Sequence, residues 1–334
     1  MSFIRTQVSE GVGEIVLDRP KALNALDQSM IDDLYRVLGE WGDDDAIDTV
    51  LVTSSHSRAF CAGGDIRAVR EHAVAGETAA VTHYFASEYR LNQLIAEYPK
   101  PYVALIDGAA MGGGLGISVH GEIRVVTENA LIAMPETAIG FFPDVGSTYF
   151  LPRLPAGVGL WLGLTGARLR GSDAVAVGLA THYVPSADLQ RVADAIRSGA
   201  GLAEALADHR APVTTTLPLA KIAGYFEPGV PPAALIGGLQ GAAGDEWAEQ
   251  MLDLLAGASP TSLAVTAALI EAGEQSSLAQ CLERELHAAE QITATHDFAE
   301  GVRAVLVDKD RNPQFDPATL DAVDGALVAR IVGA

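Results

Sequence analysis

Two acidic residues lie close together in a stretch of the chain that is otherwise apolar or turn-forming. Residues 134–146 read Met-Pro-Glu-Thr-Ala-Ile-Gly-Phe-Phe-Pro-Asp-Val-Gly, so both carboxylates, Glu136 and Asp144, directly follow a proline. Burial of an unpaired carboxylate is costly and favours its protonated form, which makes these acids candidates for acid–base or nucleophilic chemistry. The alternative is structural: Glu136 would begin a helix, where an acid favours the helix dipole, and Asp144 would shape a turn.

Two glycine-rich segments are candidates for a site that stabilises negative charge. Residues 59–65 read Ala-Phe-Cys-Ala-Gly-Gly-Asp and residues 108–114 read Gly-Ala-Ala-Met-Gly-Gly-Gly, and each segment follows a predicted strand. Glycine permits close approach of the backbone to a ligand, and two N–H donors aimed at one oxygen would form an oxyanion hole for attack on a carbonyl. Alternatively, both segments are tight turns required for packing. Neither segment fits a dinucleotide fingerprint or a phosphate-binding P-loop.

Strands that alternate with helices must position these segments. Short β-branched or apolar runs predict strands, and apolar residues at helical spacing predict helices, including one that begins after an Asp27 cap. The expected strands are 14–17, 49–53, 102–106, 123–126, 131–133 and 182–184, and the expected helices are 27–41, 78–97, 111–120 and 172–178. This alternation indicates an α/β fold with parallel strand pairing.

The last third of the chain has a different character. Alanine and leucine at helical spacing dominate 189–206, 235–255 and 262–289, with a surface loop expected at 224–232. We therefore expect a strand-bearing core over residues 1–200 and a helical C-terminal region over residues 201–334 that packs on the core.

Composition limits the classes of partner. The 334 residues are 49% hydrophobic, which suffices for a large core, and 43 acids against 22 bases give a net charge of −21. This charge argues against nucleic acid or an anionic membrane surface as a partner. Cys61 and Cys281 suggest neither a disulfide framework nor a zinc site. Since the N-terminus has no apolar signal core or basic presequence and no run spans a bilayer, we expect a soluble, cytoplasmic protein.

Several motifs in order resemble one family. Asp-Arg-Pro-Lys-Ala-Leu-Asn-Ala-Leu at 18–26, Ala-Phe-Cys-Ala-Gly-Gly-Asp-Ile at 59–66, Met-Gly-Gly-Gly at 111–114 and Pro-Glu-Thr-Ala-Ile-Gly at 135–140 resemble the crotonase (enoyl-CoA hydratase/isomerase) superfamily. Three further segments, 101–114, 142–153 and 296–310, are most similar to its 3-hydroxyisobutyryl-CoA hydrolase branch. The resemblance implies a spiral of ββα units, with the acyl-CoA site in the core and helices covering the acyl pocket.

The resemblance also implies the roles of individual residues. The oxyanion donors match the N–H groups of Gly64 and Gly113, and the two acids match Glu136 and Asp144. Glu88 matches a further acid that contacts the substrate, although an acid at this place on a helix is also an ordinary surface residue. We expect the two amides to converge on one acyl oxygen within reach of the acids.

Coenzyme A is implied as part of the substrate. Lys21 and Leu23 on one loop, and Ala62, Asp65 and Ile66 on another, match positions that lie against coenzyme A. No metal or redox cofactor is implied. Crotonases commonly form trimers or hexamers, so a homo-oligomer is expected, with a smaller assembly left open because the C-terminal helices would cover the same surface.

One position separates the reactions of this superfamily. Hydratases use a second glutamate shortly after the triple glycine, where this chain has Gly116. Water addition to a double bond requires two flanking carboxylates, so the pattern favours hydrolysis of a short 3-hydroxyacyl-CoA thioester, with 3-hydroxyisobutyryl-CoA of valine breakdown as the expected substrate. Alternatives are an enoyl-CoA hydratase or isomerase using Glu136 alone, and a homologue that binds acyl-CoA without catalysis.

In the expected hydrolysis, Glu136 either attacks the thioester carbonyl to form a mixed anhydride or acts as a base on water. Asp144 positions water or the substrate hydroxyl, and Glu88 hydrogen-bonds that hydroxyl. By contrast, Asp297 and Glu300 in the 296–310 segment are interpreted as an N-cap and its partner in a helix that runs through Leu306.

Overall fold

The computed structural model describes residues 2–207 and 209–333. Its packing divides the chain into two compact units, each built from three segments. Unit 1 comprises Met1–Gly64, Arg90–Ile132 and Leu169–Leu217, and unit 2 comprises Asp65–Tyr89, Ala133–Arg168 and Pro218–Ala334. The sequence predicted two consecutive regions that meet near residue 200, whereas these units are defined by packing and each combines several segments. The predicted boundary therefore stays a prediction.

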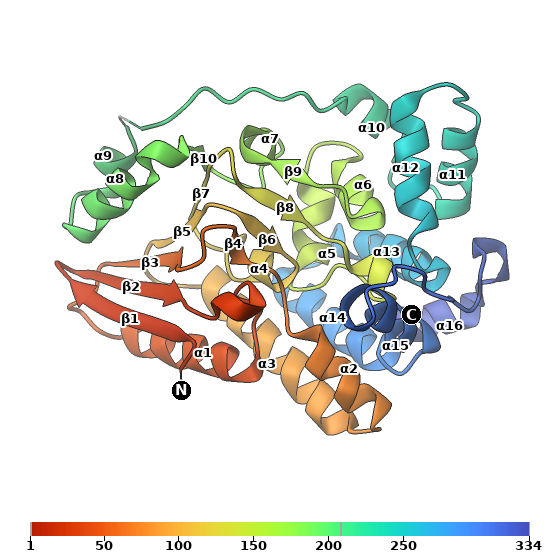
Figure 1. The fold of residues 1–334 in the computed structure, drawn as a ribbon, viewed down its shortest axis with the longest axis horizontal. Helices are drawn as coiled ribbons and strands as arrows, with labels where there is room; N and C mark the ends of the chain where they lie inside the picture. Colours follow the sequence, from red (N-terminus) through yellow and green to blue (C-terminus); the bar gives the residue numbers. More distant parts are fainter. Residues whose placement is uncertain (1, 208, 334) are drawn as a thin grey trace. The chain divides into compact units, whose positions relative to one another are not determined.

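Unit 1 contains a six-stranded sheet with the order β1-β2-β3-β5-β7-β10 (Figure 1). Its strands are β1 (Ile4–Ser9), β2 (Val12–Leu17), β3 (Thr49–Ser54), β5 (Tyr102–Ile106), β7 (Ile123–Val126) and β10 (His182–Tyr183). Only β1 and β2 pair antiparallel, and the other neighbours are parallel. The predicted α/β fold with parallel pairing is confirmed, whereas β1, which has a single buried residue, was not predicted.

Helices pack on both faces of this sheet, because side chains of a strand alternate between faces. Gly13 of β2 faces α1 (Gln28–Gly42) so closely that a Cβ there would lie 2.5 Å from the ring of Trp41. Its neighbour Val12 points the other way, into an apolar cluster with residues of α8 (Ser186–Arg197) and α9 (Leu202–Ala207). The buried strands therefore read as nearly continuous apolar runs.

The helix predicted from Asp27 onward is confirmed, including its cap. The Asp27 carboxylate accepts a hydrogen bond from the Met30 N–H, and the apolar residues of α1 that face β2 are buried. Unit 1 also contains η1 (Pro20–Ala22), α4 (Gly113–Gly116) and α7 (Gly171–Ala176). The helix expected at 111–120 is thus only one turn long, since consecutive glycines disfavour a longer helix.

A second sheet with the order β4-β6-β8-β9 was only partly predicted. Its strands are β4 (Ala59–Cys61), β6 (Ala109–Met111), β8 (Leu131–Ala133) and β9 (Leu169–Arg170). Only β8 was expected, because β4 and β6 lie within the two segments that the sequence assigned to glycine-rich turns and β9 has only two residues. The parallel pairing of β4 with β6 places the two glycine-rich segments side by side.

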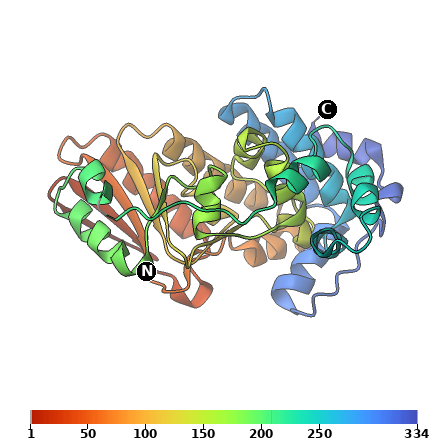
Figure 2. The same cartoon turned by 90° about the horizontal axis from the view of Figure 1, so that it is seen from above.

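Unit 2 is helical. It contains α2 (Ile66–Val74), the part of α3 (Thr78–Ala96) up to Tyr89, and the helices of the C-terminal third, coloured teal to blue in Figure 1 and Figure 2. Between α3 and the C-terminal third lie η2 (Glu136–Ile139), α5 (Ser147–Phe150), η3 (Leu151–Arg153) and α6 (Val158–Thr165). The elements of the C-terminal third are α10 (Leu219–Tyr225), α11 (Pro232–Gln240), α12 (Glu246–Ala256), α13 (Pro260–Gly273), α14 (Leu278–Ile292), α15 (His296–Val302), the π-turn η4 (Arg303–Val307), η5 (Leu320–Ala322) and α16 (Gly325–Val332). The long apolar stretches predicted as helices are helical, with a break inside each.

Within residues 2–207 and 209–333, no single helix has both the length and the hydropathy needed to span a membrane. Helices α12 and α13 reach that threshold only as a pair, and they are bent by 106° at the break between them.

Candidate active site

Three carboxyl groups of unit 2 are buried. Glu88 lies on α3, Glu136 is the first residue of η2, and Asp144 lies in the loop between η2 and α5; their residues are 2%, 8% and 6% exposed. Glu136 does begin a short helix, as the structural interpretation of the sequence proposed, but it is buried there. Glu88 is not a surface acid of its helix. Burial of a carboxyl group costs free energy that an exposed carboxylate does not lose, so the burial of each acid has to be explained.

Stacked aromatic rings hold the loop of Glu136 and Asp144 against two helices. Phe141, between the two acids, stacks on Phe85 of α3 with 5.3 Å between ring centroids and on Phe142 at 4.5 Å. It also packs against Phe298 of α15 at 5.8 Å. Rings in such geometries attract one another beyond the burial of their area. The apolar residues that separate the acids in sequence thus fix the loop and desolvate the acids.

Close backbone contacts place α15 directly on the turn that carries Glu136. Gly140 has φ +72°, and a Cβ there would lie 2.1 Å from the carbonyl oxygen of Asp297. Likewise, a Cβ on Gly301 would lie 2.4 Å from the carbonyl carbon of Ile139. Only glycine fits at these two positions, because any side chain would meet backbone atoms rather than a flexible side chain.

Burial and mutual repulsion raise the pKa values of these acids. Burial, followed by the charge of Asp144, raises the pKa values of Glu136 and Glu88 well above their usual range. Burial raises the pKa of Asp144 to about 7, although the hydrogen bond from Tyr89 opposes the shift. Clustered carboxyls in low dielectric do not all ionise together. At neutral pH this site therefore holds protons that ordinary carboxylates release.

Unsatisfied oxygen atoms distinguish these acids from structural ones. Among the residues that the structure describes, Glu136 Oε2 and Glu88 Oε1 have no hydrogen-bond partner despite being buried. Such an atom costs free energy in the folded protein unless a ligand or water meets it. The two atoms are therefore candidates for hydrogen bonds with a ligand.

Sequence reasoning missed two residues of the site, Tyr89 and Glu285. The Tyr89 hydroxyl donates a 2.8 Å hydrogen bond to Asp144 Oδ2, and the Glu285 carboxylate accepts hydrogen bonds from the turn that follows Asp144. A signal existed for Glu285: it lies on the apolar face of α14, whose other buried residues include Cys281 and Ala288. An acid in that register of an amphipathic helix predicts a buried charge.

The 296–310 segment is a support for the site rather than a simple capped helix. Thr295, not Asp297, caps α15, and its hydroxyl accepts from the Phe298 N–H. Asp297 is buried and accepts hydrogen bonds from the Ser259 hydroxyl at 2.5 Å and the Asp316 N–H at 2.8 Å. The cap assignment made from the sequence was therefore wrong, since the Asp297 carboxylate joins segments distant in sequence.

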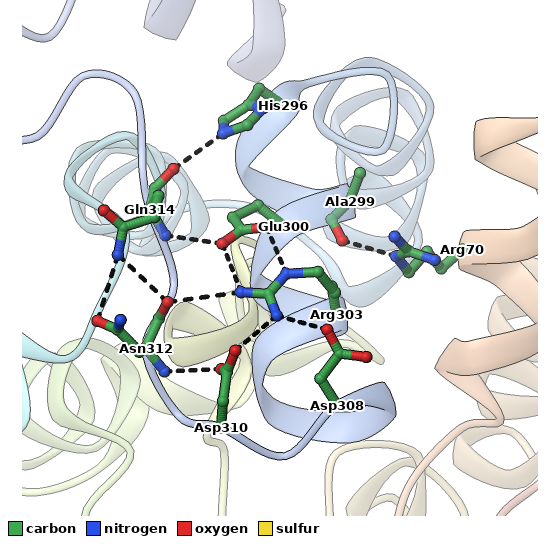
Figure 3. A network of polar contacts seen from close by, with 9 residues as sticks. All are labelled: Arg70, His296, Ala299, Glu300, Arg303, Asp308, Asp310, Asn312 and Gln314. Atoms are coloured by element: carbon green, nitrogen blue, oxygen red, sulfur yellow. Dashed lines mark hydrogen bonds and ion pairs between the residues drawn. The ribbon is translucent and has the colours of Figure 1, made fainter.

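An arginine organises the end of this segment (Figure 3). Arg303 donates to both oxygens of Glu300 at 2.8 Å and also contacts Asp308 and Asp310 at 2.6 and 2.7 Å. This pairing lowers the pKa of Glu300 to about 2. The α-helix expected through Leu306 ends at Val302 and continues as a π-turn. Arg303 thus folds the following loop back onto α15.

The two glycine-rich segments lie together in unit 1. A Cβ on Gly63, which has φ +111°, would lie 3.2 Å from the Met111 carbonyl oxygen and 4.0 Å from the Gly113 nitrogen. Gly113 is the first residue of α4, so its N–H is among those with no acceptor inside the helix. The sequence predictions of Gly64 and Gly113 as oxyanion donors, and of their convergence with the acids, stay predictions.

The loops assigned to coenzyme A are joined by backbone hydrogen bonds. The Ala62 N–H donates to the Leu23 carbonyl at 3.0 Å, and the Leu26 N–H donates to the Gly63 carbonyl at 2.8 Å. Lys21 lies in η1, which ends directly before Leu23. Leu23 is 39% exposed. These contacts make the two loops one surface of unit 1.

Asp65 and Ile66 open unit 2 at the start of α2. The Asp65 N–H donates to the Tyr84 hydroxyl at 3.2 Å, and Ile66 is the first residue of the helix. Their assignment to coenzyme A stays a prediction. Among the described residues, no group of three or more His, Cys, Asp or Glu side chains is placed to hold a metal ion.

The α/β architecture, the aligned glycine-rich segments of unit 1 and the buried acids of unit 2 agree with the crotonase motifs found in the sequence. The chain matches the family model described as enoyl-CoA hydratase/isomerase over residues 12–332. It therefore belongs to the enoyl-CoA hydratase/isomerase family, as the motifs predicted.

Sequence relatives include proteins named as 3-hydroxyisobutyryl-CoA hydrolases. The chain is 44% identical to the mitochondrial 3-hydroxyisobutyryl-CoA hydrolase of Xenopus tropicalis, over 93% of this chain and 83% of that protein. It is 40% identical to the human protein of the same name, over 93% and 83%. It is 38% identical to 3-hydroxyisobutyryl-CoA hydrolase 1 of Arabidopsis thaliana, over 98% and 90%.

Solved structures confirm the predicted fold. A Rhodobacter sphaeroides protein described as an enoyl-CoA hydratase is 37% identical, with a TM-score of 0.93 over 99% of this chain and 97% of that one. A Mycobacterium thermoresistibile protein described as a carnitinyl-CoA dehydratase is 38% identical, with a TM-score of 0.92 over 99% and 96%. The chain thus has the α/β crotonase fold with a helical C-terminal region.

Proposed function

We propose that this protein hydrolyses 3-hydroxyisobutyryl-CoA to 3-hydroxyisobutyrate and coenzyme A, a step of valine catabolism. The observation that carries the proposal is the buried pair Glu136 and Asp144, with raised pKa values and an unsatisfied Glu136 oxygen. Identity of 38–44% to 3-hydroxyisobutyryl-CoA hydrolases over nearly the whole chain supports the same substrate.

Glu136 performs the first chemical step. A carboxylate that is poorly solvated and strongly basic is a better nucleophile or base than an exposed one once it has lost its proton. In one route the Glu136 oxygen attacks the thioester carbon, the C–S bond breaks with coenzyme A leaving as its thiolate, and water then hydrolyses the mixed anhydride to the product acid and free Glu136. In the other route Glu136 takes the proton of a water that attacks the thioester carbon, the C–S bond breaks, and that proton passes to the leaving thiolate. Negative charge on the acyl oxygen is stabilised by the amides of Gly64 and Gly113, and Asp144 orients the water or the substrate hydroxyl.

Thiol release from 3-hydroxyisobutyryl-CoA tests this function. A disulfide dye follows free coenzyme A, while ultraviolet absorbance of methacrylyl-CoA in parallel follows loss of a double bond. We expect thiol release without a change in the enoyl substrate. The reverse result makes the protein a hydratase, the function named for the similar Rhodobacter sphaeroides structure, and no turnover with either substrate makes it a binding protein.

The route is decided by one turnover in ¹⁸O-labelled water with enzyme in excess. Label in the Glu136 carboxyl, read by mass spectrometry of its peptide, supports the anhydride, because water then opens the anhydride at the carboxyl carbon of Glu136. Label found only in the product after a single turnover rules out opening at Glu136 and shows that water attacks the acyl carbon.

The expected cytoplasmic location and the homo-oligomer, with a trimer or hexamer foremost, are further parts of this proposal. Cell fractionation and light scattering of the purified protein test them independently of activity.

A further inference from the structure

Glu285 binds the turn that follows Asp144. This residue of α14 is fully buried, and its Oε2 accepts from the Gly146 N–H at 2.7 Å. Its Oε1 accepts from the Thr148 N–H at 3.0 Å and from the Thr148 hydroxyl at 2.6 Å. Both oxygens are therefore occupied by one short segment of a distant part of the chain.

The segment that Glu285 holds is conformationally costly. Val145 has φ +55° and Gly146 has φ +83°, and a β-branched residue is strained in the left-handed region. The chain also turns tightly here, since the Ser147 N–H donates to the Asp144 carbonyl at 2.9 Å. Such a backbone persists only where surrounding contacts impose it, and the Glu285 carboxylate supplies three of them.

Asp144 is consequently held from two sides. Tyr89 of α3 donates to its carboxylate at 2.8 Å, while Glu285 of α14 binds the amide two residues further on. Burial raises the pKa of Glu285 to about 8, so placing an acid here is costly, and an apolar residue of similar size would often stabilise the fold as well. The three hydrogen bonds that this buried acid accepts therefore point to a role in placing the turn.

We infer that Glu285 is a positioning residue for hydrolysis: its carboxylate fixes the Val145–Thr148 turn and thereby aims the Asp144 carboxylate at the reacting water or the substrate hydroxyl. This inference rests on the proposed function of the site. Glu285 acts through Asp144 and does not touch the substrate, since its own oxygens are engaged by Gly146 and Thr148.

The test is Glu285→Gln, which replaces one acceptor oxygen with an N–H₂ group that faces backbone donors. We expect kcat/KM for 3-hydroxyisobutyryl-CoA to fall on the order of 10- to 100-fold, as for a catalytic group displaced by about 1 Å. In an Asp144→Asn background the same substitution should cost less than about threefold, because the residue through which it acts is already lost. Equal losses in both backgrounds would overturn the inference.

The matched control lies on the same helix. Glu290 of α14 accepts a 2.8 Å hydrogen bond from Thr82 but does not contact the Asp144 turn. Glu290→Gln should change kcat/KM by less than about twofold. A loss as large as that of Glu285→Gln would show that any weakened α14 impairs activity, against a specific positioning role.

A readout without turnover separates this inference from the proposed function. Amide hydrogen exchange of the peptide containing Gly146 and Thr148 should quicken at least about tenfold in Glu285→Gln. Unchanged exchange refutes the inference even if the wild-type enzyme hydrolyses the substrate, whereas faster exchange in a protein that releases no thiol refutes only the proposed function. Should Glu285→Gln not fold, Thr148→Val removes one of the three bonds, and a loss of about 3- to 10-fold in kcat/KM is expected.

Discussion

At the scale of single residues, burial and mutual repulsion of three carboxyl groups decide which of them are protonated. Asp144 has a pKa of about 7 through burial, and its charge helps to raise the pKa values of Glu136 and Glu88. Two like charges in a poorly solvated site oppose one another, so ionisation of one acid keeps a proton on its neighbour. A site that has to attack a carbonyl and also hold a proton uses this division of roles.

Asp144→Asn should stabilise the protein at alkaline pH. Because burial raises the pKa of folded Asp144 to about 7 from its ordinary value of 3.8, the cost of its charge to stability is absent below about pH 4 and complete above about pH 7. We expect the variant to gain about 1–3 kcal/mol of unfolding free energy at pH 8 and nothing at pH 4, measured by urea denaturation. Asp253→Asn, on the exposed face of α12, serves as control, and equal gains from both variants would contradict the prediction.

Glu88→Ala should affect hydroxylated substrates selectively. Glu88 is buried with a free Oε1, which suits a hydrogen bond to the 3-hydroxyl of the acyl group. Loss of a buried hydrogen bond to a carboxyl costs about 1.5–3 kcal/mol, so KM for 3-hydroxyisobutyryl-CoA should rise roughly 10- to 100-fold. KM for isobutyryl-CoA should change by less than about threefold, and parallel rises for both substrates would remove hydroxyl recognition from the role of Glu88.

At the scale of elements, α15 and η2 pack against each other through direct backbone contacts. Their backbones meet at Gly140 and Gly301, where no side chain fits, and Asp297 of α15 also binds Ser259 at the start of α13. Glu136 is the first residue of η2, so the position of this proposed catalytic acid depends on helices that come much later in the chain. The 296–310 motif is thus explained by packing rather than by chemistry.

Gly140→Ala should destabilise the fold strongly. Its Cβ would lie 2.1 Å from the Asp297 carbonyl oxygen at a φ of +72°, so both the backbone angle and the contact oppose it. We expect a loss of about 3–5 kcal/mol in urea denaturation, with activity falling along with it. Gly237→Ala in α11, where a Cβ meets nothing within 4 Å, should instead stabilise by about 0.5–1 kcal/mol. A loss of less than about 1 kcal/mol for Gly140→Ala would contradict the prediction, because it would mean that α15 can shift to accommodate a side chain.

At the scale of the whole molecule, charge opposes the substrate. The chain carries a net charge of −21, and coenzyme A carries several phosphate charges of the same sign. Long-range repulsion between like charges slows association, and dissolved salt screens it within about 10 Å at 0.1 M. Local backbone donors must therefore outweigh an unfavourable field.

Raising ionic strength from 10 to 150 mM should increase kcat/KM for the CoA thioester by about 2- to 5-fold. A pantetheine thioester of the same acyl group, which has no nucleotide phosphates, should be nearly insensitive. Stopped-flow measurement of thiol release compares the two substrates. If salt instead lowers kcat/KM for the CoA thioester, basic side chains at the nucleotide outweigh the overall charge.

How much the sequence revealed differed between elements. Strands β5, β7 and β8 were predicted with their observed bounds, and α1 with its Asp27 cap, because a strong local pattern determines each of them. Strands β4 and β6 were missed, because each lies within a segment that the sequence assigned to a glycine-rich turn. Their pairing, which aligns the glycine turns, arises from contacts across the chain.

The sequence by itself determined the family, because ordered motifs over most of the chain are specific, and it pointed to Glu136 and Asp144, because acids between prolines and aromatics are conspicuous. Only the tertiary structure decided that Glu88 is buried, that Tyr89 meets Asp144 and that Glu285 holds the turn beyond it. These contacts join positions 55 and 139 residues apart. Local propensity carries no information about such distances, whereas desolvation and hydrogen bonding, which set the pKa values, depend on them.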